Sequence, residues 1–218
     1  MNTTDRRNWL KTIALGGGFT LLGGVQGYAS LIADYPTPLA GPAKLNSNEN
    51  PYGPSDSVRK VIQENFDSGC RYPFQYIKAL VRDIAKKEEV SEDCIVITGG
   101  STEGLKAAGL VYGLEGGEIV AADPTFQALL RYAEYFGGYV HRVPLDETLT
   151  HDLDAMERRV TGKTRLIFIC NPNNPSGTLL DAGRLRDFCS STASKAVVFS
   201  DEAYYDYITE PDYPSMTG

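Results

Sequence analysis

Four short polar or glycine-rich strings follow apolar runs of this sequence and contain residue types that bind anions or flat ligands. They read GGSTE at residues 99–103, DPTF at 123–126, NPNNPSG at 171–177 and DEAYYDY at 201–207. The two glycines let backbone N–H groups approach a ligand, and Ser101 can cap the helix that follows. The unpaired N–H groups and the dipole at the start of that helix favour a phosphate monoester. This string predicts an anion site, although a glycine pair beside a helix cap is also a common structural feature.

The other three strings carry an aromatic ring, several amides and a carboxylate. Phe126 is expected in the first turn of a helix, where it either stacks on a flat ligand or joins the core. Three asparagines within residues 171–177 are more amide side chains than a strand-to-helix connection needs. Asp201 directly follows a buried strand, so its carboxylate must be paired, capping a turn or functional.

Alternating helices and strands position these strings. Hydrophobic periodicity predicts helices over residues 55–66, 74–84, 101–114, 125–136, 152–160 and 181–193, and apolar strands over residues 94–98, 118–122, 139–143, 165–170 and 196–200. Strands separated by helices of this length predict an α/β fold, with a mostly parallel sheet flanked by helices on both faces. Ligands of such sheets bind outside the carboxyl ends of the strands, so the four strings are expected at one edge.

Composition narrows the class of protein. The chain has 218 residues, of which 42% are hydrophobic and 22% charged, as in ordinary globular proteins. Its net charge of −7 makes a nucleic-acid partner improbable. The four widely spaced cysteines predict neither a metal site nor a disulfide scaffold, and Cys94 and Cys170 lie in apolar runs where we expect them to be buried.

The N-terminal residues read as a targeting segment. Arg6 and Arg7 precede an uncharged, glycine-rich stretch at residues 12–25, and the arrangement resembles a twin-arginine export signal. We expect a signal peptide over residues 1–29, cleaved after Ala29, and a periplasmic or other extracytoplasmic location without a stable membrane span. An uncleaved helix on the membrane surface is the alternative. Residues 30–54 are expected to form an extended arm, and residues 55–218 a single domain.

The ordered strings, together with LNSNENPYGPS at residues 45–55 and RYP at 71–73, resemble the pyridoxal phosphate enzymes of fold type I. The similarity is to class I/II aminotransferases of the histidinol-phosphate type, and it runs from about residue 45 to residue 218. NPNNPSG and DEAYYDY are its specific part. The resemblance implies the N-terminal portion of the large cofactor-binding domain and pyridoxal 5′-phosphate as cofactor.

The resemblance also implies roles for individual residues. At the cofactor, Gly100, Ser101 and Thr102 would hold the phosphate, Phe126 would stack on the pyridine ring, Asn174 and Tyr204 would bond its phenolic oxygen, and Asp201 would pair with its nitrogen. Tyr72 would reach the phosphate of the partner subunit's cofactor, which implies a homodimer. Asn48 and Tyr52 belong to a segment that would cover the substrate.

The implied reaction moves an amino group from an amino acid or amino-alcohol phosphate to a 2-oxo acid. In the family a Schiff-base lysine, substrate-binding arginines and a small C-terminal domain come after the DEAYYDY string, whereas no lysine follows Lys195 here. We therefore expect no catalytic residue in this chain, and a truncated enzyme that is inactive alone. A related pyridoxal phosphate lyase or decarboxylase, and a noncatalytic remnant of the fold, are the alternatives.

Overall fold

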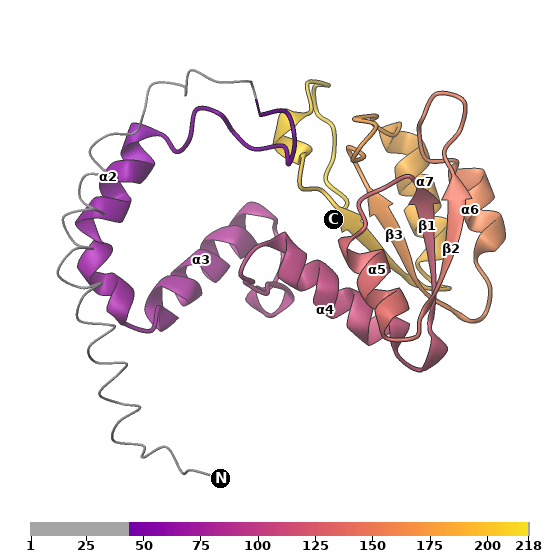
Figure 1. Ribbon diagram of the computed structural model, residues 1–218, viewed down its shortest axis with the longest axis horizontal. Coiled ribbons are helices and arrows are strands. Elements are labelled where there is room, and N and C mark those ends of the chain that lie inside the picture. The colour runs from indigo at the N-terminus through magenta and orange to yellow at the C-terminus, as the bar shows by residue number, and fades with distance from the viewer. Residues whose placement is uncertain (1–43, 218) are drawn as a thin grey trace, which may run out of the picture. The chain divides into compact units, whose positions relative to one another are not determined.

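The computed structural model describes residues 44–217 of the chain (Figure 1). The chain divides into two compact units, residues 1–72 and residues 73–218. The predicted signal peptide and the first part of the predicted arm lie outside the described residues. None of the helices within residues 44–217 is long and apolar enough to cross a membrane, and that range holds no cluster of three potential metal ligands.

The first unit contains helix α2 (Asp56–Glu64) and the short 3-10 helix η1 (Phe66–Cys70). Ser55 is the N-cap of α2, and its side chain accepts a hydrogen bond from the Val58 N–H. None of the side chains of α2 is buried.

The second unit carries a four-stranded parallel sheet in the order β2-β1-β3-β4. Its strands are β1 (Glu118–Asp123), β2 (Tyr139–Pro144), β3 (Thr164–Cys170) and β4 (Val197–Asp201). Its helices are α3 (Phe74–Lys87), α4 (Ser101–Gly113), α5 (Ala128–Tyr135), α6 (Leu153–Arg159) and α7 (Ala182–Thr192), with 3-10 helices η2 (Glu92–Cys94), η3 (Leu114–Gly116) and η4 (Tyr205–Tyr207). The predicted α/β class is confirmed.

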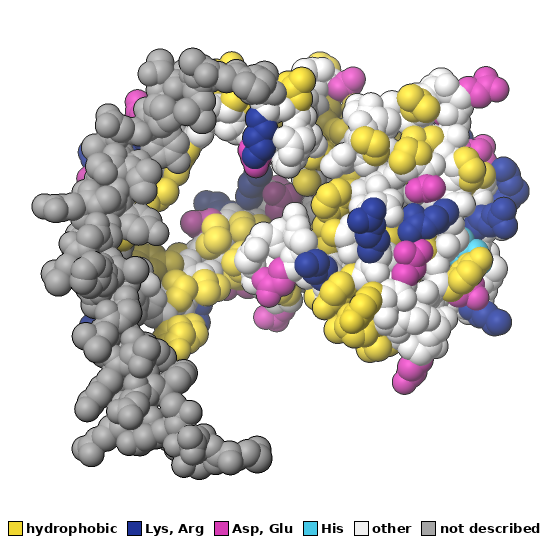
Figure 2. All heavy atoms as spheres, in the orientation of Figure 1, with side chains coloured by type: hydrophobic (Ala, Val, Ile, Leu, Met, Phe, Trp, Pro, Cys, Tyr) yellow, Lys and Arg dark blue, Asp and Glu magenta, His cyan; other side chains and the backbone are white. Residues whose placement is uncertain are grey.

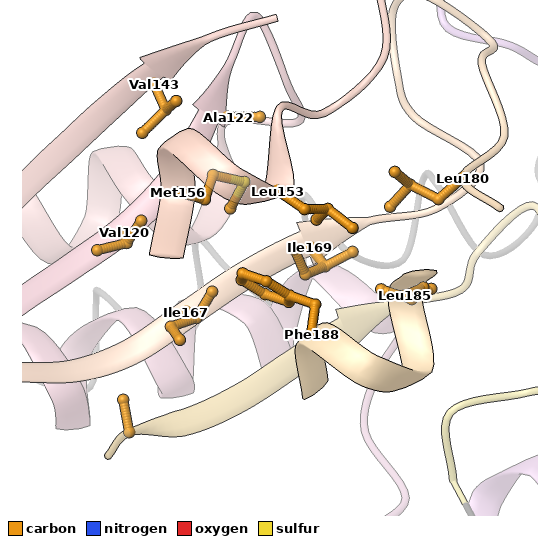
Figure 3. Close-up of a cluster of buried hydrophobic side chains, with 11 residues drawn as sticks. Val120, Ala122, Val143, Leu153, Met156, Ile167, Ile169, Leu180, Leu185 and Phe188 are labelled. Atoms are coloured by element: carbon orange, nitrogen blue, oxygen red, sulfur yellow. The ribbon is translucent and has the colours of Figure 1, made fainter. Parts of the chain in front are cut away.

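Helices cover both faces of the sheet (Figure 1). On one face, Leu105 of α4 and Leu129 of α5 pack against Ile119 and other residues of the sheet. On the opposite face lie α6 and α7, where Met156 and Phe188 pack over β3 (Figure 3). Because both faces are covered, the two inner strands β1 and β3 are apolar and buried along most of their length, whereas the outer strand β2 has both buried and exposed residues.

Helix α3 differs from the helices that cover the sheet, because much of its apolar surface stays exposed. Hydrophobic side chains are yellow in Figure 2, and the exposed ones of α3 are Phe74, Tyr76, Ile77 and Leu80. Ala85 is the one buried residue of this helix. The described residues of the unit therefore leave an apolar face of α3 uncovered.

Two glycines let α4 pack closely on α5. A Cβ atom at Gly109 would lie 2.5 Å from the Leu129 carbonyl oxygen, and one at Gly113 would lie 2.9 Å from Ala133. Both distances are shorter than van der Waals contact, so larger residues would push the helices apart. Gly104, on the same helix, has only ordinary contacts, the nearest at 3.8 Å.

Gly109→Ala should therefore destabilise the chain by about 1–3 kcal/mol through overpacking, in spite of the better helix propensity of alanine. Gly104→Ala is the matched control, and it should stabilise by up to about 1 kcal/mol because alanine gains propensity without a clash. Denaturant unfolding of both variants measures the difference. Equal midpoints would show that α4 and α5 can separate without cost.

The prediction of a strand over residues 94–98 is wrong. The backbone at Ile95 is extended (φ −106°, ψ 126°), but no strand within residues 44–217 pairs with this segment. Cys94 is exposed rather than buried as predicted, and Val96 is 82% exposed. Apolar character makes a segment suitable for a sheet, but a strand forms only where a neighbour completes its hydrogen bonds.

The helix predicted over residues 125–136 begins later, at Ala128, so Phe126 precedes the helix instead of lying in its first turn. The Thr125 hydroxyl donates to Asn173 at 2.8 Å, and the Gln127 side-chain amide donates to the Thr125 carbonyl at 2.7 Å. These bonds hold residues 124–127 in an irregular turn, which competes with helix formation.

Candidate functional site

Asp201 is the last residue of β4 and lies opposite Cys170 of β3 in the sheet register. It is only 8% exposed, and its carboxylate accepts a hydrogen bond from the Ala203 N–H at 3.2 Å. Burial raises the pKa of this carboxyl, and the neighbouring Glu202 raises it further. The site therefore holds a buried negative charge, to which the chain donates a hydrogen bond from a backbone N–H. A cationic group of a ligand would be a strong partner for this charge.

Asn174 and Tyr204 meet at the same edge of the sheet. The Asn174 side-chain amide donates to the Tyr204 hydroxyl at 3.3 Å, which joins the loop after β3 to the turn after β4. Asn171 reinforces the junction, because its backbone N–H donates to the Asp201 carbonyl at 3.0 Å. The structure thus brings Asn174, Asp201 and Tyr204 together, as the sequence predicts from the strand order.

Cys170 shows that the loop after β1 reaches the same place. The thiol is buried and lies within interaction distance of the Asp201 carboxylate, the Thr125 side chain and the backbones of Phe126 and Asn174. Burial chiefly, and then the Asp201 charge, raise the pKa of Cys170 to about 11. The thiol is therefore a protonated, unreactive part of the core, with the three strand ends gathered around it.

Phe126 is half-buried and packs against the core cluster under α4 and α5. Both interpretations offered by the sequence are therefore compatible with its position, since the residue packs on the core and stays partly exposed. Phe126 adjoins Thr125, whose side chain is tied to the loop after β3.

The predicted anion site is the glycine turn at the start of α4. Gly100 is the N-cap, with φ +94°, and no side chain caps the helix. Ser101, expected as a possible cap, is instead the first helical residue, and Ser101 and Thr102 are both exposed. Thr98 donates to the Gly100 carbonyl at 2.8 Å, and the Gly99 N–H donates to the Glu103 carboxylate. These bonds are local to the turn.

Three predicted residues belong to the first unit. Tyr72 and Tyr52 are 85% and 87% exposed, and Asn48 is exposed with a positive φ of 51°. Their roles at the partner's phosphate and over the substrate stay predictions.

A supporting network that the sequence does not predict holds the segment after β4. The Asn171 side chain donates to the Tyr213 hydroxyl at 2.8 Å and accepts from the Leu180 N–H at 2.9 Å. The Glu202 carboxylate accepts from the Ser200 and Ser215 hydroxyls at 2.9 and 2.7 Å. The surplus of asparagines after β3 was the only sequence signal for this network.

Comparison with known proteins identifies the family. The sequence profile of the aminotransferase class I and II family matches residues 41–216. The chain is 40% identical over 172 residues to a histidinol-phosphate aminotransferase of Moorella thermoacetica, covering 79% of this chain and 44% of that protein. The chain spans about half the length of the curated relatives that it matches.

Solved structures have the same fold. The histidinol-phosphate aminotransferase from Clostridium acetobutylicum superposes with a TM-score of 0.68 at 24% identity, over 79% of this chain and 50% of that one. The enzyme from Sinorhizobium meliloti, solved in complex with pyridoxal-5′-phosphate, gives a TM-score of 0.68 at 23% identity over 73% of this chain and 44% of that one. By its match along residues 41–216, the chain belongs to the aminotransferase class I and II family.

Proposed function

We propose that this chain forms the cofactor-binding part of a pyridoxal 5′-phosphate-dependent aminotransferase. Pyridoxal 5′-phosphate is the cofactor of the family, and the described residues fit it. The observation that carries the proposal is Asp201, a buried carboxylate with a raised pKa at the end of β4, the outermost strand of the described sheet. A protonated pyridine nitrogen is the kind of cationic partner that such a carboxylate requires.

The neighbouring residues fit the rest of the cofactor. Phe126 offers a partly exposed aromatic ring for stacking, and the Asn174 amide and Tyr204 hydroxyl are hydrogen-bonding groups suited to the ring's phenolic oxygen. The turn at Gly100 leaves the first amides of α4 without a side-chain cap, and the exposed Ser101 and Thr102 add hydroxyls for a phosphate.

When bound, the cofactor supplies an electron-withdrawing ring that stabilises negative charge at the substrate Cα. Asp201 contributes by holding a proton on the ring nitrogen. For the whole protein we propose transfer of an amino group from an amino acid or amino-alcohol phosphate to a 2-oxo acid, supported by the histidinol-phosphate aminotransferases among its relatives. We further propose a homodimer, in which Tyr72 reaches the partner subunit's cofactor phosphate.

Equilibrium dialysis of the chain against pyridoxal 5′-phosphate tests the cofactor assignment, with pyridoxal, which lacks the phosphate, as the matched ligand. We expect saturable binding of the phosphate ester and much weaker binding of pyridoxal. Equal affinities would show that the turn at Gly100 binds no phosphate. Absence of binding would contradict the proposal.

A second measurement separates the reactions open to the family. The whole protein that carries this chain is incubated with histidinol phosphate and a 2-oxo acid, and the products are analysed. Formation of a new amino acid from the 2-oxo acid supports transamination. In a second incubation, with a phosphorylated amino acid in place of histidinol phosphate, loss of carbon dioxide without amino transfer would favour a decarboxylase instead.

We also propose export by the twin-arginine route, on the pattern around Arg6 and Arg7. This route carries folded proteins, which suits a cofactor loaded before transport. Replacing both arginines by lysine should keep the protein in the cytoplasm, as cell fractionation would show, whereas the single change Lys11→Arg should leave export intact. Unchanged export of the twin-lysine variant would mean that residues 1–29 are not such a signal.

A further inference from the structure

One of the three asparagines after β3 has a set of contacts that the proposed cofactor contacts do not use. Asn173 is only 3% exposed. Its side-chain oxygen accepts from the Thr125 hydroxyl at 2.8 Å, and its side-chain nitrogen donates to the Pro124 carbonyl at 3.2 Å and the Ser176 hydroxyl at 2.9 Å. A buried amide with this many partners is fixed in place.

These bonds connect two loops that are far apart in sequence. Thr125 lies 48 residues before Asn173 and is only 4% exposed. Thr125 is the immediate neighbour of Phe126, and Asn173 is the immediate neighbour of Asn174. The bridge therefore joins the neighbour of the residue proposed for the face of the cofactor ring to the neighbour of a residue proposed for its edge.

Regular secondary structure does not fix this spacing. Strand β1 ends at Asp123 and α5 begins at Ala128, while β3 ends at Cys170 and α7 begins at Ala182. Phe126 and Asn174 both lie in the irregular segments between these elements. Within the second loop, the Asn173 N–H donates to the Thr178 carbonyl at 2.9 Å, so the loop closes on the same residue that forms the bridge.

We propose that Thr125 and Asn173 are positioning residues, whose buried hydrogen bond sets the spacing between the Phe126 ring and the Asn174 amide. The proposal rests on the proposed function in one respect, since that function assigns Phe126 and Asn174 to the cofactor. A buried hydrogen bond is costly to leave half-made, so loss of one partner releases both segments.

The test compares Thr125→Val, which keeps the shape but removes the hydroxyl, with Thr125→Ser, which keeps the hydroxyl. Equilibrium dialysis against pyridoxal 5′-phosphate should show affinity reduced about tenfold in the valine variant, the equivalent of one net hydrogen bond, and restored to within about twofold by serine. The unfolding midpoints of both variants are measured in parallel. If the affinity falls only in step with the unfolding midpoint of each variant, and serine does not restore it, the role of Thr125 is merely structural.

A double-mutant cycle and an exchange measurement complete the test. Thr125→Val should reduce affinity in the wild-type chain but not in Asn173→Ala, because the bridge is already broken there.

In the ligand-free chain, the Asn173 and Gly177 amides should exchange about tenfold faster in the valine variant, while core amides of β1 stay unchanged.

The two proposals fail in different ways. A wild-type chain that binds no cofactor contradicts the proposed function, and amide exchange alone then decides whether the bridge fixes the loops. If the wild-type chain binds and Thr125→Val binds equally well, the cofactor assignment stands and the positioning role is overturned. Unchanged exchange at Asn173 and Gly177 would overturn it too.

Discussion

Asp201→Asn should reduce the affinity of the chain for pyridoxal 5′-phosphate at least about a hundredfold, because breaking a buried charge pair costs about 3 kcal/mol or more. Asparagine has nearly the shape of aspartate and keeps an oxygen that can accept from the Ala203 N–H. What it lacks is the charge that would hold a proton on the ring nitrogen. Dialysis of the two proteins side by side measures the difference.

The stability of the same variant should move in the opposite direction. The folded pKa of Asp201 is raised above its ordinary value, so its charged form opposes folding at neutral pH, and this cost disappears as the pH falls through the folded pKa. Asp201→Asn should therefore unfold at an equal or higher denaturant concentration at neutral pH.

Asp201→Glu keeps the charge and should recover part of the affinity. Wild-type affinity in the asparagine variant would assign the carboxylate to capping alone.

Acid should destabilise the fold through His151. This residue is 4% exposed, and its Nε2 is buried without a hydrogen-bond partner among residues 44–217. Burial lowers its pKa to about 4 from 6.5, although the Asp146 charge acts in the opposite direction. The unfolded chain therefore takes up a proton between these values while the folded chain does not. Stability should be unaffected above about pH 6.5 and fall by up to about 3 kcal/mol as the pH decreases to about 4.

His151→Gln isolates this effect, because other groups titrate equally in both proteins. The difference in unfolding free energy between wild type and variant should change with pH only below about pH 6.5, in favour of the variant. The environment of His141 differs from that of His151, since the His141 ring pairs with Glu118 at 2.9 Å and is less enclosed. A pH-independent difference between wild type and His151→Gln would mean that water reaches the imidazole.

The strand ends could be predicted from sequence because apolar runs of suitable length alternate with helical periodicity, and parallel strands bring their carboxyl ends to one edge. Asp201 therefore lies beside the loop of Asn174, as expected. The start of α5 could not be predicted in this way. It depends on a hydrogen bond from Thr125 to a residue 48 positions away, which local propensity does not contain.

Residues 94–98 illustrate the same limit for strands. Their composition is as apolar as that of β3, yet strand formation depends on a neighbour, and no strand in the described part of the chain pairs with them. The bridge of Asn173 was visible in the sequence only as a surplus of amides. Its partners became apparent only in the structure, because sequence spacing does not reveal which loops meet.

The central claim is that Asp201 pairs with the ring nitrogen of pyridoxal 5′-phosphate. It is tested most directly by nuclear magnetic resonance of the cofactor, isotopically labelled at that nitrogen and bound to the chain at mildly alkaline pH. We predict the chemical shift of a protonated nitrogen in the wild-type chain and that of an unprotonated nitrogen in Asp201→Asn. An unprotonated nitrogen in the wild-type complex, or the same shift in both proteins, would contradict the account.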